Sequence, residues 1–143
     1  GIELRFIELM NMGHLQASPV HGQQFYAMDE ILACISERYG FTRTDAPFDS
    51  TAVRYEIPGH GTFGIIANES EPFCKNCTRL RLSSNGDLYG CLSNARSQSI
   101  RELLPLSDEE AVPQLQTILL SALGDKQSDN FSGEVTVMKF IGG

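Results

Sequence analysis

The sequence predicts an α/β fold in which a small antiparallel sheet is flanked by helices. Short runs rich in β-branched and aromatic residues alternate with turn residues, which is typical of strands. Two other segments repeat apolar residues at helical spacing. With 143 residues, 41% of them hydrophobic, the chain is long enough to bury one core. We therefore expect a single folding unit.

The expected elements follow from these patterns and from the turn residues between them. Strands are predicted at residues 4–10, 52–57, 62–67, 79–82, 87–91 and 134–141. Helices are predicted at residues 28–39, 100–104 and 108–124. Ser107 and the acidic residues after it mark the start of the last helix, and Gly124 marks its end. Residues 14–24 are expected to form a polar loop.

Charge and hydropathy exclude two classes of partner. The net charge of -7 argues against nucleic-acid binding, which normally requires an excess of basic residues. No apolar stretch approaches the roughly 20 residues that cross a bilayer, and no leader segment opens the chain, so we expect a soluble, cytoplasmic protein with no membrane partner. Because the chain starts without a methionine, we expect an excised fragment. The oligomeric state is left open, and a homodimer is one candidate.

Three of the four cysteines lie within one eighteen-residue segment, which favours a metal site over a disulfide scaffold. Cys74 and Cys77 form a C-x2-C turn, and a hairpin at residues 85–86 is expected to return Cys91 toward them. A four-iron cluster normally takes four cysteines, so three would leave one iron with an open coordination position. Cys34 lies on a predicted helix, and we interpret it as a buried core residue.

Basic side chains surround this cysteine segment. Residues 74–101 contain five of them and a single acid, Asp87, which favours an anionic ligand. Arg79 and Arg81 are two positions apart on a predicted strand, so they are expected to share a face. Guanidinium groups suit phosphate because their paired donors match its oxygens.

Other interpretations stay open at this point. The C-x2-C turn also fits a zinc knuckle with His14, His21 or His60 as the fourth ligand, or a redox disulfide. The two arginines also fit a solvated strand, and a terminal Gly-Gly pair also fits a frayed chain end. A zinc-stabilised structural or binding module is therefore the rival interpretation.

Residues 71–92, EPFCKNCTRLRLSSNGDLYGCL, resemble the second cluster motif of the molybdenum cofactor biosynthesis protein A family. These are the GTP 3',8-cyclases of the radical S-adenosylmethionine superfamily, whose pattern is similar to F-C-x2-C-N-R-L-R-L-T-x-x-G-x-L-x-x-C-L-F. The matching positions are Phe73, Cys74, Cys77, Arg79, Leu80, Arg81, Leu82, Gly86, Leu88, Cys91 and Leu92. Thr78 and Ser93 depart from it, because the family usually has Asn and Phe there. Residues 5–10, 50–67 and 138–143 resemble further family segments.

The resemblance implies a set of site residues. A four-iron four-sulfur cluster, with one iron open to the purine of GTP, would be held by Cys74, Cys77 and Cys91. GTP would be bound by Arg79, Leu80 and Arg81. Met10 matches a family position near S-adenosylmethionine. Gly142 and Gly143 match a catalytic tail that enters the active site, where residues without side chains can approach closely.

The C-x3-C-x2-C motif that binds the radical-generating cluster of this superfamily is absent from the chain. The resemblance therefore implies the C-terminal part of a larger lyase, with S-adenosylmethionine and a second four-iron cluster held elsewhere, and a fragment inactive alone. Residues 1–45 would supply the last strand and helix of an incomplete (β/α) barrel, and residues 46–143 the iron-sulfur and GTP-binding domain. An auxiliary-cluster domain of another radical enzyme is a third interpretation.

Overall fold

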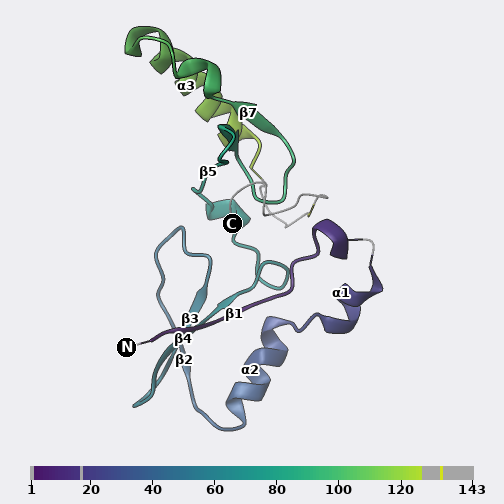
Figure 1. Ribbon diagram of the computed structural model, residues 1–143. Coiled ribbons are helices and arrows are strands. Elements are labelled where there is room, and N and C mark those ends of the chain that lie inside the picture. Colours follow the sequence, from purple (N-terminus) through teal and green to yellow (C-terminus); the bar gives the residue numbers. More distant parts are fainter. Residues whose placement is uncertain (1, 17, 127–132, 134–143) are drawn as a thin grey trace.

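The computed structural model describes residues 2–16, 18–126 and 133. A four-stranded sheet lies at one end of the elongated molecule, and a three-stranded sheet with a long helix lies at the other (Figure 1). The predicted α/β class, with small antiparallel sheets and flanking helices, is confirmed, although the strands form two sheets.

The first sheet has the strand order β1-β4-β3-β2. β1 runs parallel to β4 and places Ile7 opposite Ile66, whereas the other pairs are antiparallel. The strands predicted at residues 4–10, 52–57 and 62–67 are confirmed with slightly different bounds. The edge strand of this sheet at residues 42–44 was not predicted. The bounds are β1 Leu4–Ile7, β2 Thr42–Thr44, β3 Val53–Ile57 and β4 Gly61–Ile66.

Helix α2, Met28–Ser36, covers one face of this sheet (Figure 1). It packs through apolar residues at positions i, i+3, i+4 and i+7, namely Met28, Ile31, Leu32 and Ile35. Their partners are the buried Tyr55, Phe63, Ile65 and Ala67. The rings of Tyr55 and Phe63 stack with centroids 5.1 Å apart. The helix ends before Tyr39, where the prediction had placed its end.

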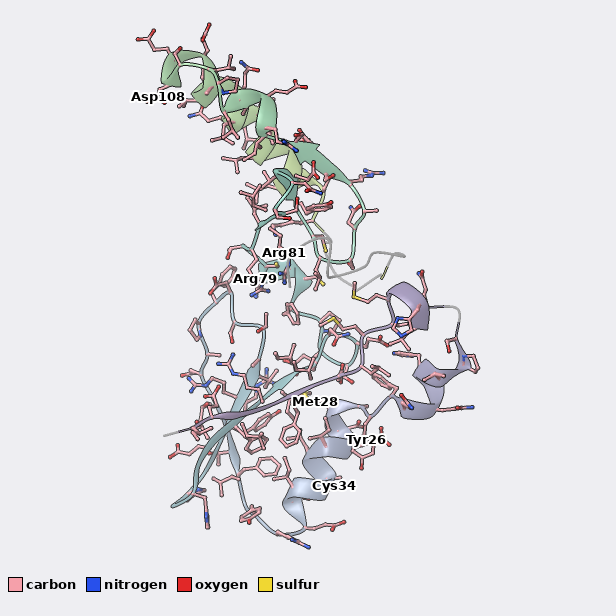
Figure 2. The ribbon with its side chains drawn as sticks, in the orientation of Figure 1. Tyr26, Met28, Cys34, Arg79, Arg81 and Asp108 are labelled. Carbon is pink, nitrogen blue, oxygen red and sulfur yellow. The ribbon has the colours of Figure 1, made fainter. Side chains whose placement is uncertain are left out.

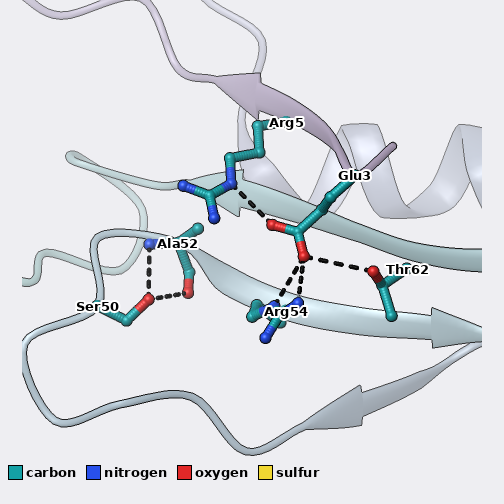
Figure 3. Close-up of polar contacts among 6 residues, drawn as sticks. All are labelled: Glu3, Arg5, Ser50, Ala52, Arg54 and Thr62. Atoms are coloured by element: carbon teal, nitrogen blue, oxygen red, sulfur yellow. Dashed lines mark hydrogen bonds and ion pairs between the residues drawn. The ribbon is translucent and has the colours of Figure 1, made fainter. Parts of the chain in front are cut away.

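A carboxylate at the start of β1 ties three strands together (Figure 3). Glu3 accepts hydrogen bonds from Arg5 Nε at 2.8 Å and from Arg54 Nε at 2.9 Å. It also accepts one from Thr62 Oγ1 at 3.3 Å. The hydrogen bonds from Arg5 and then Arg54 lower the pKa of Glu3. The contacts fix the position of β1 at the edge of the sheet.

The second sheet has the order β5-β6-β7, and its first hairpin turns at Gly86, whose φ is 82°. The predicted hairpin is confirmed, and the helices predicted at residues 100–104 and 108–124 are present, the first as a 3-10 turn. The Ser107 hydroxyl donates to Glu110 at 3.0 Å at the start of the last helix. The elements are β5 Arg81–Leu82, β6 Asp87–Tyr89, β7 Ser97–Ser99, η3 Arg101–Leu103 and α3 Asp108–Gly124.

Two expectations were wrong. Residues 14–24 are not a loop, because they include most of a 3-10 turn, η1 Gly13–Leu15, and a whole helix, α1 Pro19–Gln24. Ser18 Oγ accepts the Val20 amide at 3.2 Å and caps that helix. Cys34 is exposed rather than buried and contacts the Tyr26 hydroxyl at 3.0 Å.

The strand predicted at residues 134–141 lies outside the described residues. No helix in the described part of the chain is long and apolar enough to span a membrane.

Candidate metal centre

A cavity of about 220 Å³ lies where the two sheets meet, and the three clustered cysteines line it. One wall comes from the ends of β1 and β4 and from residues just after them. The other wall comes from the cysteine segment and from the residue that follows α3 by two positions. The lining residues are Ile7, Met10, Thr51, Ile66, Asn68, Phe73, Cys74, Cys77, Arg79, Arg81, Gly90, Cys91, Leu92 and Lys126.

Local geometry explains how the cysteines reach this cavity. A 3-10 turn, η2 Cys74–Asn76, lets the Cys77 amide donate to the Cys74 carbonyl at 3.1 Å, so both ends of the C-x2-C turn meet the same space. The β5–β6 hairpin pairs Arg81 with Tyr89 and thereby returns Cys91 to the turn. The Cys91 thiol lies 3.3 Å from the hydroxyl of the fully buried Ser93.

The pKa values of the two thiols in the C-x2-C turn are shifted in opposite directions. Burial, and then the neighbouring Cys91 and Cys77, raise the pKa of Cys74. Burial alone would also raise the pKa of Cys77. A backbone hydrogen bond at Arg79 and the positive charges of Arg79 and Lys126 outweigh it, so the Cys77 pKa is lowered. One thiolate of the turn is thus stabilised before any metal binds.

Lys126 closes the cavity from the end of α3. Its ammonium group donates to the Cys77 sulfur at 3.6 Å and to the Gly90 carbonyl at 3.0 Å, and it also donates to the Arg79 carbonyl. The segment after α3 is therefore fastened to both parts of the cysteine segment. This residue was not expected from the sequence, because it lies 49 positions from Cys77.

Arg79 and Arg81 both line the cavity, whereas Leu80 does not. Figure 2 places the two arginines between the sheets, far from Cys34. Arg79 Nη1 donates to the Asp49 carbonyl at 2.9 Å, and its guanidinium lies 5.3 Å from the centre of the Phe73 ring. The other terminal nitrogen, Nη2, is buried and has no hydrogen-bond partner in the described part of the chain. A buried cationic donor of this kind fits an anionic ligand.

The histidines considered as zinc ligands do not line the cavity. His60 lies in the β3–β4 turn against Tyr39, with ring centroids 5.3 Å apart, and His21 contacts the Leu9 carbonyl at 2.9 Å. Met10 does line the cavity. Gly142 and Gly143 lie outside the described residues.

The chemistry of the donor set fits an iron-sulfur cluster. Across residues 2–16, 18–126 and 133, no three His, Cys, Asp or Glu side chains are close enough to hold one ion. The three cysteines nevertheless line the same cavity. A cubane cluster binds each thiolate through a different iron, so its ligands stand apart by the width of the cluster, and soft thiolates suit iron and sulfide.

Two further residues were missed at the sequence level. Asn68 is buried against the cavity, and both polar atoms of its amide lack a partner in the described part of the chain. Glu8 is 2% exposed and accepts the amides of Glu69 at 2.9 Å and Ser70 at 3.1 Å, so it holds the turn that begins at Asn68. For Asn68, the sequence signal was a polar residue directly after the apolar end of a strand.

Comparison with known proteins decides the family. The family described as Molybdenum Cofactor Synthesis C matches residues 2–132. The chain belongs to this family. The match includes the cysteine segment and residues 5–10 and 50–67, so the family resemblance of the sequence is confirmed.

Individual relatives agree with this assignment. A GTP 3',8-cyclase of Synechocystis is 36% identical over 114 residues, covering 80% of this chain and 34% of the relative. A GTP 3',8-cyclase of Aquifex aeolicus is 33% identical over 101 residues, covering 71% of this chain and 31% of the relative. Molybdenum cofactor biosynthesis protein moc-5 of Caenorhabditis elegans is 31% identical over 131 residues, covering 89% and 21%. The chain thus spans about a third or less of these relatives.

Proposed function

We propose that this chain is the cluster-binding and GTP-binding part of a GTP 3',8-cyclase in molybdenum cofactor biosynthesis. The observation that carries the proposal is one cavity lined by three cysteines and by a buried guanidinium nitrogen without a partner among the described residues. The family match and the names of the relatives support it.

Each group of lining residues has a separate task. Cys74, Cys77 and Cys91 would hold a four-iron four-sulfur cluster, which supplies an iron open to the purine when it is bound. Arg79 binds phosphate through its free nitrogen, and its contact with the Asp49 carbonyl keeps the guanidinium plane in place. Arg81 adds a second positive charge to the same wall. The bound nucleotide is thus fixed at two points, which lowers the entropic part of the barrier.

The remaining chemistry belongs to the larger protein. Met10 lies at the cavity wall formed after β1, where it would face S-adenosylmethionine bound by the rest of the enzyme. The four cysteines of this chain leave no set for the second, radical-generating cluster. We therefore expect GTP binding but no turnover from the chain alone, and turnover once the rest of the enzyme is supplied.

Anaerobic reconstitution with iron and sulfide tests the metal assignment. We expect a brown protein with about four irons per chain, as in a cubane cluster. Cys91→Ala should lose the colour, whereas Cys34→Ala should keep it because Cys34 is exposed and lies outside the cavity. A colourless chain that retains one zinc would show that the site is structural.

Equilibrium titration of the reconstituted chain with GTP tests the nucleotide assignment. A hydrogen bond to a charged group is worth about 1.5–3 kcal/mol, so Arg79→Gln should weaken binding by about tenfold to a hundredfold. Arg38→Gln is the control, because Arg38 is exposed and does not line the cavity. Equal affinities for the two variants would contradict the role of Arg79.

A further inference from the structure

Asn68 combines deep burial with unused hydrogen-bonding capacity. Its side chain is 1% exposed and lines the cavity, and neither Oδ1 nor Nδ2 has a partner in the described part of the chain. Leaving a buried polar group unpaired costs about 1–3 kcal/mol, so native structures seldom do so without a reason. An amide that carries both a donor and an acceptor into a cavity points to a bound ligand.

The backbone around Asn68 is held on both sides. β4 precedes it and ends at Ile66, and the buried Ala67 accepts the Glu71 amide at 3.2 Å across the turn. The next two amides donate to the Glu8 carboxylate at 2.9 Å and 3.1 Å. The amide group therefore projects from a fixed turn, which is the arrangement expected of a residue that positions a ligand.

The position of Asn68 relative to the other lining residues indicates which part of a nucleotide it meets. Asn68 belongs to the wall formed at the ends of β1 and β4, whereas the cysteines, Arg79 and Arg81 belong to the wall formed by the cysteine segment. In a nucleotide the ribose lies between base and phosphates. If the base lies at the cysteines and the phosphates at Arg79, the ribose faces the wall that carries Asn68.

Chemistry supports the same pairing. No carboxylate lines the cavity within the described residues, and Asn68 supplies the only side-chain amide there. A cis-diol offers hydroxyl groups that both donate and accept, so Oδ1 can accept from one hydroxyl while Nδ2 donates to the other. We propose that Asn68 binds the 2' and 3' hydroxyls of the GTP ribose and orients that sugar. This inference rests on the proposed GTP site.

Binding of GTP, 2'-deoxy-GTP and 3'-deoxy-GTP to the reconstituted chain tests the proposal. We expect the wild-type chain to prefer GTP over each deoxy analogue by about tenfold, the value of one good hydrogen bond. Asn68→Leu should reduce that preference to less than about twofold. Asn68→Asp should retain it, because each carboxylate oxygen can accept a hydroxyl proton.

Thermal unfolding of the ligand-free chain separates a ligand role from a structural one. Asn68→Leu should keep or raise the midpoint, since an apolar group of similar size replaces an unpaired polar one. The matched control, Gln116→Leu on the exposed face of α3, should change neither the midpoint nor the ribose preference. A lower midpoint for Asn68→Leu would reveal a structural partner and overturn the proposal.

The remaining outcomes are also decisive. If Asn68→Leu weakens GTP and both deoxy analogues equally, Asn68 contacts the base or phosphates, and the ribose assignment is wrong. If Asn68→Leu leaves GTP binding unchanged, Asn68 contacts no part of the nucleotide. If the wild-type chain binds no GTP while holding its cluster, the proposed function itself fails.

Discussion

Replacing Glu8 with glutamine tests how the end of β1 is joined to the start of α2 and to the turn after β4. The Glu8 carboxylate accepts three backbone amides: Met28 at the start of α2 at 2.9 Å, Glu69 at 2.9 Å and Ser70 at 3.1 Å. The first bond uses Oε1 and the other two use Oε2. One buried side chain thus supplies the shorter of two hydrogen bonds to the Met28 amide, whose other acceptor is Ser70 Oγ at 3.4 Å, and also holds the turn that begins at Asn68.

The size of the effect follows from this division of oxygens. A glutamine amide oxygen can serve the turn, but its NH2 group then faces the Met28 amide, donor against donor. The Met28 amide keeps only its longer hydrogen bond to Ser70 Oγ at 3.4 Å. The buried glutamine NH2 group is left without an acceptor, at a cost of about 1–3 kcal/mol, and a carboxylate near the positive end of a helix is lost, at about 0.3–1 kcal/mol. We expect a loss of about 2–3 kcal/mol, and about 3–5 kcal/mol for Glu8→Ala.

Urea unfolding of the chain, followed by circular dichroism, measures this loss. Thermal unfolding gives a second measurement. A domain of this size loses a few degrees of melting temperature per kcal/mol of lost stability, so the melting temperature of Glu8→Gln should be about 6–10 °C lower. Glu56→Gln is the control, because it makes the same change at an exposed position of β3. If the free energies of unfolding of the two variants differ by less than about 0.5 kcal/mol, the Glu8 carboxylate does not connect these segments as the geometry indicates.

Two further predictions concern the cavity walls. In the metal-free chain, iodoacetamide should label Cys77 at lower pH than Cys74, because the pKa of Cys77 is lowered, that of Cys74 is raised, and only the thiolate reacts; the opposite order by mass spectrometry would contradict the assigned charges. Gly90→Ala should destabilise the chain by about 1–3 kcal/mol in thermal unfolding, since an added Cβ would lie 1.8 Å from the Ala122 carbonyl oxygen. Gly22→Ala adds a Cβ that meets nothing within 4 Å and should keep or slightly raise the midpoint, because alanine favours the helix α1 in which Gly22 lies. A midpoint for Gly90→Ala as high as that of Gly22→Ala would show that α3 can shift freely.

Elements with a strong local signal were predicted well. The hairpin follows from Asn85 and Gly86, because Gly86 adopts a positive φ that few other residues tolerate. The start of α3 follows from Ser107 and the acids after it. The C-x2-C turn was visible because two cysteines at that spacing fit one turn of a 3-10 helix.

Elements whose signal is short or depends on tertiary contacts were missed. Helix α1 has a capping Ser18 and Pro19 at its first position, but its six residues carry no apolar repeat. β2 has only three residues and is defined by its pairing with β3. Cys34 was misplaced because its burial was inferred from its residue type and not from the helical period: the core positions of α2 are 28, 31, 32 and 35, and position 34 lies off that face.

Only one wall of the candidate site could be predicted from local sequence signals, because the other depends on tertiary contacts. One wall is a continuous motif, so its cysteines could be found as a metal site from their spacing, and Arg79 from the basic residues around them; the family resemblance then assigned their roles. The other wall is made when β1 pairs in parallel with β4 and brings Met10 and Asn68 to the same strand ends. No local pattern encodes that pairing, so Met10 was predicted only through the family resemblance and Asn68 was missed. Because the walls are fixed by different contacts, Glu8→Gln should weaken the ribose preference but spare cluster assembly, whereas Cys91→Ala should abolish the cluster but spare the first sheet.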